Sequence, residues 1–316
     1  MRQKMILCSI AVGTLVLAGC LGPLPSATNG SNGGATTIRL AIQPTQDAAA
    51  IQSQAADLER FLEEQTGYDF QIFVPLTYIG VIEALKYGHA DVAMMSAWPA
   101  ATAAAVANAR IELAEWREVI VQGQPVIAPS YYSYYVVLAD SPYQTLDELR
   151  GKTVAYPSTT STSGYVYPVA KLVERQLVPA PAAGREADPK AFFGNVLASG
   201  GYQGAWNALR NGQADVAVTA GDIAASLFYE VLNNTRVVET QGPIPSHAVV
   251  FGEEFTGEKA ARTKAAFLEL KGEKKETMRK LVSAIFVEFR ATTTAEHVAP
   301  LQSALTTTGL RLVERL

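Results

Sequence analysis

The chain has 316 residues, with 26 Lys and Arg against 30 Asp and Glu, which gives a formal net charge of −4 at pH 7. Its length is sufficient for two domains, and its apolar content of 48% is typical of a globular protein. The acidic balance, with no basic stripe along the sequence, excludes a nucleic-acid-binding surface.

The N-terminus predicts secretion and a lipid anchor. Arg2 and Lys4 precede an apolar run too short to span a bilayer, and the sequence Leu-Ala-Gly-Cys then ends at Cys20. This tetrapeptide resembles the bacterial lipoprotein box, whose Cys carries the lipid. We expect residues 1–19 to be a lipoprotein signal peptide, Cys20 to be lipidated in the cell envelope, and residues 20–37 to form a flexible tether. The alternative is an ordinary signal peptide with an incidental Cys20.

Beyond the tether, the sequence predicts alternating strands and helices. A capping box at Thr145–Glu148 marks one helix start in the second half of the chain. Strands are expected at Ile38–Gln43, Tyr68–Val74, Thr153–Tyr156 and Asn195–Ser199. Helices are expected at Ala48–Gln65, Ser163–Gln176, Glu258–Leu270 and Glu273–Arg290. Such alternation is typical of α/β proteins with parallel sheets.

An internal repeat indicates two similar lobes. Residues 78–96 and 202–220 are identical at nine of nineteen positions, with an offset of 124. In each copy an amphipathic helix ends at a glycine suited to a left-handed C-cap, and Ala-Asp-Val-Ala then begins an apolar strand of the kind buried in a parallel sheet. Two copies at this spacing do not make a solenoid, and they predict two α/β lobes of similar structure.

The lobes are expected to be joined by two crossover strands. We assign residues 38–130 to the first lobe, 131–139 to the first crossover and 140–238 to the second lobe, while residues 239–316 form the second crossover and return to the first lobe. The expected fold class is therefore α/β, a bilobal clamshell. Two independent domains in series are the alternative, but the last part of the chain contains no complete third lobe. In a clamshell the carboxyl ends of the strands, where open α/β sheets bind ligands, face each other across the cleft.

A cluster of hydroxyl residues follows one of these strand ends. Ser161, Thr162 and Ser163 stand at the start of the predicted helix that follows the strand at 153–156. A helix N-terminus offers free backbone N–H groups and partial positive charge, so this position suits a tetrahedral anion. Simple N-capping is the alternative, although a single Ser would be enough for a cap.

The same region resembles a known family. Ser-Thr-Ser-Gly at 161–164, after Lys152-Thr-Val-Ala-Tyr-Pro, looks like the signature of the phosphate/phosphite/phosphonate-binding proteins of ABC transporters. Similar segments stand at 38–45, 81–93, 131–133 and 146–152. The similarity covers most of the mature chain and implies the type II periplasmic-binding-protein fold.

The resemblance also implies a function and a mechanism. The protein is expected to be an extracytoplasmic solute-binding lipoprotein, a monomer without a cofactor, whose partners are the permease and ATPase subunits of an ABC importer. Ser161, Thr162 and Ser163 are expected to cradle the anionic head of a small phosphorus oxyanion, while Tyr78 reaches it from the first lobe. The two lobes are expected to close over the ligand.

Several positions depart from the family pattern and leave the ligand open. The segment 96–100 replaces a Gly-Pro-x-Ser-Tyr pattern, so that Ala100 stands in place of a Tyr, and Ala220 stands where an Asp is frequent. Asp222 is the one obvious carboxylate for an ammonium-bearing phosphonate. Phosphite, phosphate, another phosphonate and other small oxyanions all stay open as ligands.

Further aromatic and polar residues complete the candidate site. The ligand-binding set is completed by Ser96, Trp98, Tyr132, Tyr202 and Asp222. Trp98 is either a ligand wall or a core residue, and Tyr132 either touches the ligand or packs at the hinge. Tyr202 faces Tyr78 across the cleft or anchors its own helix. His247 is interpreted as a hinge residue.

Other functions compete with this one. An enzyme is disfavoured because His89, His247 and His297 lack metal-ligand spacing and no nucleophile motif is present. Cleavage before Cys20 removes Cys8, so neither an intrachain disulfide nor a cysteine metal site is expected. Two other receptors stay open: a sensor lipoprotein that signals to a membrane kinase, and an importer receptor for a sulfonate or carboxylate.

Overall fold

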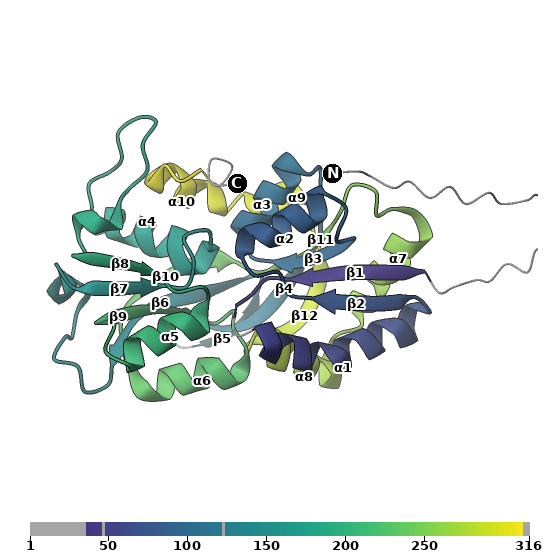
Figure 1. Ribbon diagram of the computed structural model, residues 1–316, viewed down its shortest axis with the longest axis horizontal. Coiled ribbons are helices and arrows are strands. Elements are labelled where there is room, and N and C mark those ends of the chain that lie inside the picture. The colour runs from purple at the N-terminus through teal and green to yellow at the C-terminus, as the bar shows by residue number, and fades with distance from the viewer. Residues whose placement is uncertain (1–35, 46–47, 122–123, 312–316) are drawn as a thin grey trace, which may run out of the picture. The chain divides into compact units, whose positions relative to one another are not determined.

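The computed structural model describes residues 36–45, 48–121 and 124–311. Over these ranges the chain forms two β-sheets, each with helices on both faces (Figure 1). The predicted α/β class with two sheet-based lobes is confirmed. The predicted signal peptide, Cys20 and residues 20–35 lie outside the described residues. Within those ranges, no helix combines the length and the apolar character needed to cross a bilayer.

The first sheet has a parallel half and an antiparallel half. Its spatial order is β12 (Phe286–Ala291), β4 (Arg110–Val121), β11 (Ala248–Phe251), β3 (Val92–Met95), β1 (Thr37–Ile42) and β2 (Asp69–Phe73), with β5 (Gln124–Ala128) paired to β4. Strand β1 is parallel to both of its neighbours, whereas β11 is antiparallel to β3 and β4.

Helices pack on both faces of this sheet, each through an apolar stripe of its own side chains. Helix α1 (Ala48–Thr66) buries Ile51, Ala55, Leu58 and Leu62 at the three- and four-residue spacing of one helix face. It shares a core with α7 (Gly257–Leu268) and α8 (Lys275–Leu281). The opposite face carries α2 (Tyr78–Lys86), α3 (Ala97–Val106) and α9 (Thr294–Val298).

The second sheet repeats the parallel arrangement. Its order is β10 (Thr235–Pro245), β6 (Ser130–Leu138), β9 (Val216–Ala220), β7 (Thr153–Tyr156) and β8 (Asn195–Ala198), and β7 is parallel to β8 and β9. One face carries α4 (Tyr167–Glu174) and α10 (Leu301–Thr308), and the other carries α5 (Tyr202–Arg210) and α6 (Ala225–Asn234). A π-helical turn, η2 (Thr162–Val166), leads into α4.

The sequence repeat corresponds to equivalent units of the two sheets, α2–β3 and α5–β9. Each repeated aspartate bonds its unit to the neighbouring parallel strand of the sheet: Asp91 accepts a hydrogen bond of 2.9 Å from the backbone N–H of Arg39 on β1, and Asp215 accepts one of 2.8 Å from that of Thr153 on β7. The repeated Asp is therefore a structural carboxylate. It lies at the N-terminal edge of the parallel strands in each sheet, which is the edge opposite to the predicted cleft.

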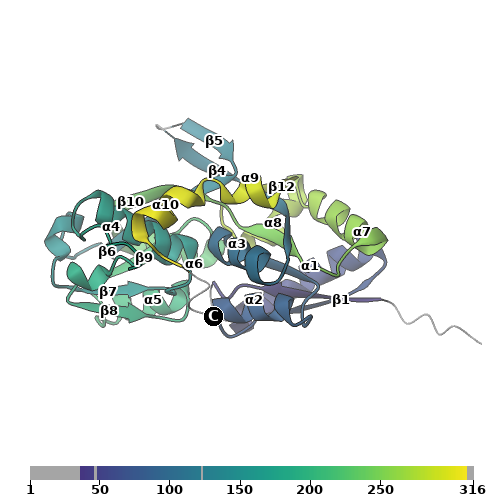
Figure 2. The same cartoon turned by 90° about the horizontal axis from the view of Figure 1, so that it is seen from above.

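Within the described residues, the chain passes between the sheets at three places. Residues 131–139, interpreted as the first crossover, supply most of strand β6 of the second sheet, and the passage occurs just before it at Pro129. The return occurs at Ser246 and His247, between β10 and β11 and inside the segment 239–316 in which it was expected. The end of that segment leaves the first sheet again, because α10 packs against α4 on the second sheet (Figure 2).

One predicted helix is wrong. Residues Glu273–Arg290 were expected to be helical, but α8 ends at Leu281 and the chain then forms β12, which pairs antiparallel with β4. The aromatic side chains of Phe286 and Phe289 pack into the core beneath α7. Pairing with a distant strand outweighs the local helical pattern here.

Candidate functional site

Polar residues from both sheets meet where the carboxyl ends of the parallel strands face one another. Gln43 follows β1 and Ser96 follows β3 in the first sheet, while Ser161 lies beyond the end of β7 and Asp222 beyond the end of β9 in the second. All four side chains are buried. This is the position at which open α/β sheets bind their ligands, so we examine it as the candidate site.

The three predicted anion-binding residues lie together at the start of η2 and are all buried, but each has a different contact. The Ser161 hydroxyl accepts a hydrogen bond of 3.0 Å from the N–H of Gly164, which makes it the N-cap. The Thr162 hydroxyl accepts one of 2.8 Å from the backbone N–H of Trp98, which belongs to the first sheet's side. Only the Ser163 hydroxyl is bonded to other side chains of the candidate site.

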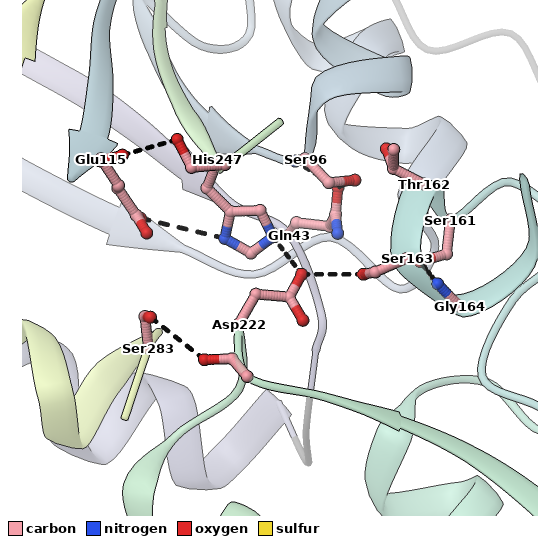
Figure 3. Close-up of polar contacts among 12 residues, drawn as sticks. Gln43, Ser96, Glu115, Ser161, Thr162, Ser163, Gly164, Asp222, His247 and Ser283 are labelled. Carbon is pink, nitrogen blue, oxygen red and sulfur yellow. Dashed lines mark hydrogen bonds and ion pairs between the residues drawn. The ribbon is translucent and has the colours of Figure 1, made fainter. Parts of the chain in front are cut away.

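Ser163 is bonded to a carboxylate. Its hydroxyl donates to Asp222 Oδ2 at 3.0 Å (Figure 3). The Tyr202 hydroxyl, 2.6 Å away, is therefore the group that donates to Ser163. Asp222 Oδ2 also lies 3.0 Å from Nε2 of His247. Asp222 Oδ1 is buried and has no hydrogen-bond partner among the described residues. The carboxylate thus has one oxygen engaged and one directed at the site without a partner.

A buried ion pair lies behind Asp222. Arg117 and Glu115, both 0% exposed, are paired through two guanidinium nitrogens and Glu115 Oε2, and the guanidinium stacks 4.2 Å from the ring of Tyr131. His247 stands between Glu115 and Asp222, with Nδ1 3.9 Å from Glu115 Oε1. Burial acts to raise the pKa of Asp222, but His247, Arg117 and Tyr131 outweigh it and hold that pKa below its ordinary value. Asp222 is therefore ionised at neutral pH.

Three tyrosines supply neutral donors around this carboxylate. Tyr78, Tyr131 and Tyr202 are each at most 2% exposed. Burial first, and then the Asp222 charge, raises the pKa of all three phenols, so they stay protonated. In the described parts of the chain, no group meets the hydroxyl of Tyr78 or Tyr131 with good hydrogen-bond geometry. Ser161 and Gln43 nevertheless lie close enough to Tyr78, and Ser163 close enough to Tyr131, to lower the pKa of each phenol in part. Buried hydroxyls of this kind require a partner, which a bound oxyanion would supply.

Direct contacts hold the two sheets together over the site. In addition to the Trp98–Thr162 bond, the backbone N–H of Tyr202 donates to the carbonyl of Thr45 at 3.0 Å. The neighbouring Gly201 has φ 149°, and a Cβ there would lie 3.1 Å from the carbonyl oxygen of Pro44. A groove of about 280 Å³ leads to this seam, lined by Tyr78 from the first sheet and by residues 157–160 from the second. The structure is thus a closed arrangement of the lobes.

The structure brings most of the predicted residues together. Ser163, Tyr78, Tyr202 and Asp222 form one buried cluster. Ser96 is buried as well, with both its N–H and its hydroxyl bonded to Gln43 Oε1 at 3.1 Å. Two more of the predicted residues have structural roles beside them. Ser161 caps η2, and Thr162 accepts the hydrogen bond from Trp98 that joins the two lobes.

Two predicted residues take other roles. The Trp98 side chain joins an apolar core that contains residues of both lobes, and its backbone N–H donates to Thr162 of the second lobe. Tyr132 packs beside α6 and β10 outside the buried cluster, because alternate residues of β6 face opposite sides of the sheet. Its neighbour Tyr131 has the inward position that was assigned to Tyr132.

Four residues of the cluster were not predicted: Gln43, Glu115, Arg117 and Tyr131. His247 was predicted only as a hinge residue, and the structure places it both between the sheets and against Asp222. Among the described residues, no group of three His, Cys, Asp or Glu side chains is arranged to hold a metal ion. The larger cavity of about 430 Å³, between residues 181–185 and the end of α10, is lined by no residue of this cluster.

Sequence comparisons identify relatives of the chain. The model of a family described as "ABC transporter, phosphonate, periplasmic substrate-binding protein" matches residues 40–297. The phosphate-import protein PhnD of Mycolicibacterium smegmatis is 31% identical over 207 residues, which are 63% of this chain and 62% of that protein. The chain therefore matches less than two thirds of the length of this curated relative.

Solved structures show the same fold. A binding protein component of an ABC phosphonate transporter from Pseudomonas aeruginosa has a TM-score of 0.70, with 20% identity and 86% of each chain covered. PhnD1 from Prochlorococcus marinus, in complex with methylphosphonate, has a TM-score of 0.67 with 11% identity, covering 89% of this chain and 99% of that one. At these identities the likeness establishes the fold alone.

Proposed function

Since the chain belongs to the phosphonate family of periplasmic substrate-binding proteins of ABC transporters, we propose that it binds a small phosphorus oxyanion in the buried cluster between its two sheets. Phosphate, phosphite and small phosphonates are the ligand class. The relative from Mycolicibacterium smegmatis is described as a phosphate importer, and the solved structure from Prochlorococcus marinus holds methylphosphonate. Both ligands are small tetrahedral oxyanions.

The observation that carries the proposal is the convergence of donors around Ser163. Its hydroxyl and the start of η2 come from the second sheet, and the hydroxyls of Tyr78 and Tyr131 are buried beside the same carboxylate, where no described residue meets them with good hydrogen-bond geometry. Hydroxyl and N–H donors at a helix start can hold an anion without a lysine or arginine in contact with it. The one buried arginine of the cluster, Arg117, is already paired with Glu115.

Binding is coupled to closure of the lobes in this proposal. The ligand enters when the sheets are apart, and the Trp98–Thr162 and Tyr202–Thr45 bonds form as the lobes close over it. The closed form then docks on the permease of an ABC importer, with an ATPase as the energy source. We further propose that the protein acts outside the cytoplasm as a monomer, held to the membrane by lipid on Cys20. It performs no catalysis.

Calorimetric titration of the purified chain with phosphate, phosphite and methylphosphonate tests the proposal. At least one ligand is expected to bind, and Ser163→Ala should weaken its binding by about 10-fold or more, since the hydroxyl that joins Tyr202 to Asp222 is lost and both groups are left without that partner. Ser53→Ala is the control, because Ser53 is an exposed serine on α1 and belongs neither to the cluster nor to the groove. Equal affinity in the Ser163 and Ser53 variants would remove the cluster as the ligand site.

A further inference from the structure

Gln43 and Ser96 link the ends of two neighbouring strands of the first sheet. Gln43 follows β1 and is 2% exposed, whereas Ser96 follows β3 and is 0% exposed. Both the N–H and the hydroxyl of Ser96 donate to Gln43 Oε1, each at 3.1 Å. Ser96 is also the N-cap of α3, yet its side chain makes no capping hydrogen bond. The hydroxyl that ordinarily caps a helix therefore donates to Gln43 instead.

These two bonds fix the direction of the Gln43 amide. A backbone N–H can only donate, so the amide atom that faces Ser96 is the oxygen, and the nitrogen points the other way (Figure 3). Burial raises the pKa of the Tyr78 phenol, the Asp222 charge adds to this, and hydrogen bonding to Ser161 and Gln43 lowers that pKa in part. A glutamine lowers the pKa of a phenol by donating to its oxygen. Gln43 Nε2 therefore lies beside Tyr78 in the cluster.

The link between the two strands uses only the oxygen of Gln43. To described residues, the hydrogen bonds of good geometry that this side chain makes are the two that its oxygen accepts from Ser96. The nitrogen carries two N–H groups, and the phenol oxygen of Tyr78 can accept from one of them. Buried N–H groups require an acceptor. An anion enclosed between the lobes would supply it.

We propose that Gln43 Nε2 donates a hydrogen bond to an oxygen of the bound oxyanion, and that Ser96 is a positioning residue that keeps the amide in this orientation. The inference rests on the proposed function and adds a donor from the first lobe to the helix start η2 of the second. A reversed amide would direct its oxygen at the anion, and two acceptors repel each other. Ser96 prevents the reversal because its N–H cannot accept a hydrogen bond.

A purely structural role for Gln43 is the competing explanation. In that case the side chain serves only to hold Ser96 and the end of β3 against β1. A glutamate has the same length and an oxygen for both of these bonds. The two explanations therefore separate in Gln43→Glu, which keeps the link to Ser96 and replaces the donor by a second, charged acceptor.

Calorimetric titration of the full chain with phosphate, phosphite and methylphosphonate tests the inference in this variant. Gln43→Glu should weaken the tightest of the three ligands by at least about 100-fold, because a donor is lost and a negative charge faces the anion. Gln213→Glu is the matched control, since it adds the same charge at an exposed glutamine between α5 and β9. Its affinity should change by less than about 2-fold, because solvent and salt screen an exposed charge.

A double-mutant cycle separates the position of the amide from the added charge and from the stability of the fold. Ser96→Gly removes the hydroxyl and should weaken binding by about 3-fold to 10-fold, because one bond to the amide is left. Gln43→Met has a similar length but neither donor nor charge, and should weaken binding by about 10-fold or more. In the Gln43→Met background, Ser96→Gly should have no further effect, because Ser96 acts through the amide. Thermal unfolding of the ligand-free variants checks that each is folded.

The outcomes separate this inference from the proposed function. Unchanged affinity in Gln43→Met, or the same loss from Ser96→Gly with and without Gln43→Met, would overturn the inference and leave the phosphorus-oxyanion site standing. If the Gln43 variants do not fold, Ser96→Gly decides, and an affinity equal to that of the unmodified chain would overturn the inference. Failure of all three ligands to bind the unmodified chain would overturn both proposals.

Discussion

Arg117 and Glu115 lie two residues apart on β4, and both are 0% exposed. From the sequence, the charged stretch around them has the composition of a strand that faces solvent on one side. Their burial comes from Tyr131 on β6, which belongs to the other sheet, so it depends on how the lobes meet. This is why the helix-start cluster at Ser161–Ser163 could be predicted from local pattern while the ion pair behind it could not.

His297 on α9 should make the protein sensitive to acid. Burial lowers the pKa of His297 from 6.5 to about 4, opposed by its hydrogen bond to the Ser246 carbonyl and assisted by Arg117 and His247. The unfolded chain therefore takes up a proton near pH 6.5, whereas the folded chain does so only near pH 4. The free energy of unfolding should fall as pH drops through this window, by up to about 3 kcal/mol from this group.

Denaturant titrations across that pH range measure this contribution. His297→Gln keeps a donor for the Ser246 carbonyl and should flatten the dependence of the free energy of unfolding on pH. His89→Gln changes an exposed histidine and should leave the dependence as it is in the unmodified chain. An unaltered slope in His297→Gln would show that other groups account for the acid sensitivity.

At the level of elements, the helix–strand repeat was the most informative feature of the sequence, because it is a local pattern with strict positions. It located α2–β3 and α5–β9, their glycine C-caps and the equivalence of Tyr78 and Tyr202. The edges of the fold were harder to predict. The strand β12 and the passage of α10 onto the second sheet depend on partners more than a hundred residues away, which local periodicity does not contain.

Gly201, at the N-cap of α5, should be required for closure. A Cβ at this position would lie 3.1 Å from the Pro44 carbonyl of the other lobe, whereas at Gly200 a Cβ would meet nothing within 4 Å. Both glycines have positive φ, so alanine strains the backbone at either site by about 1–3 kcal/mol. Gly201→Ala should weaken ligand affinity about 10-fold more than Gly200→Ala, as measured by calorimetry. Equal losses in the two variants would mean that this contact does not limit closure.

At the level of the whole molecule, three passages of the chain join the sheets, at Pro129, at Ser246–His247 and between α9 and α10. The second of them lies close to the cluster: His247 contacts Asp222, and Ser246 donates to the carbonyl of Glu115. The residues that would bend when the lobes open are thus bonded to the groups beside the ligand. Ligand binding and the relative position of the sheets should therefore be coupled.

The measurement that tests the central claim most directly is thermal unfolding of the purified chain with and without phosphate, phosphite and methylphosphonate. A ligand that binds only the folded, closed form at about 100 times its dissociation constant adds about 2.7 kcal/mol to the free energy of unfolding. For a chain of this size the midpoint should rise by roughly 5–10 °C with at least one of the three. A cooperative transition whose midpoint is unchanged by all three would contradict a phosphorus-oxyanion site between the sheets.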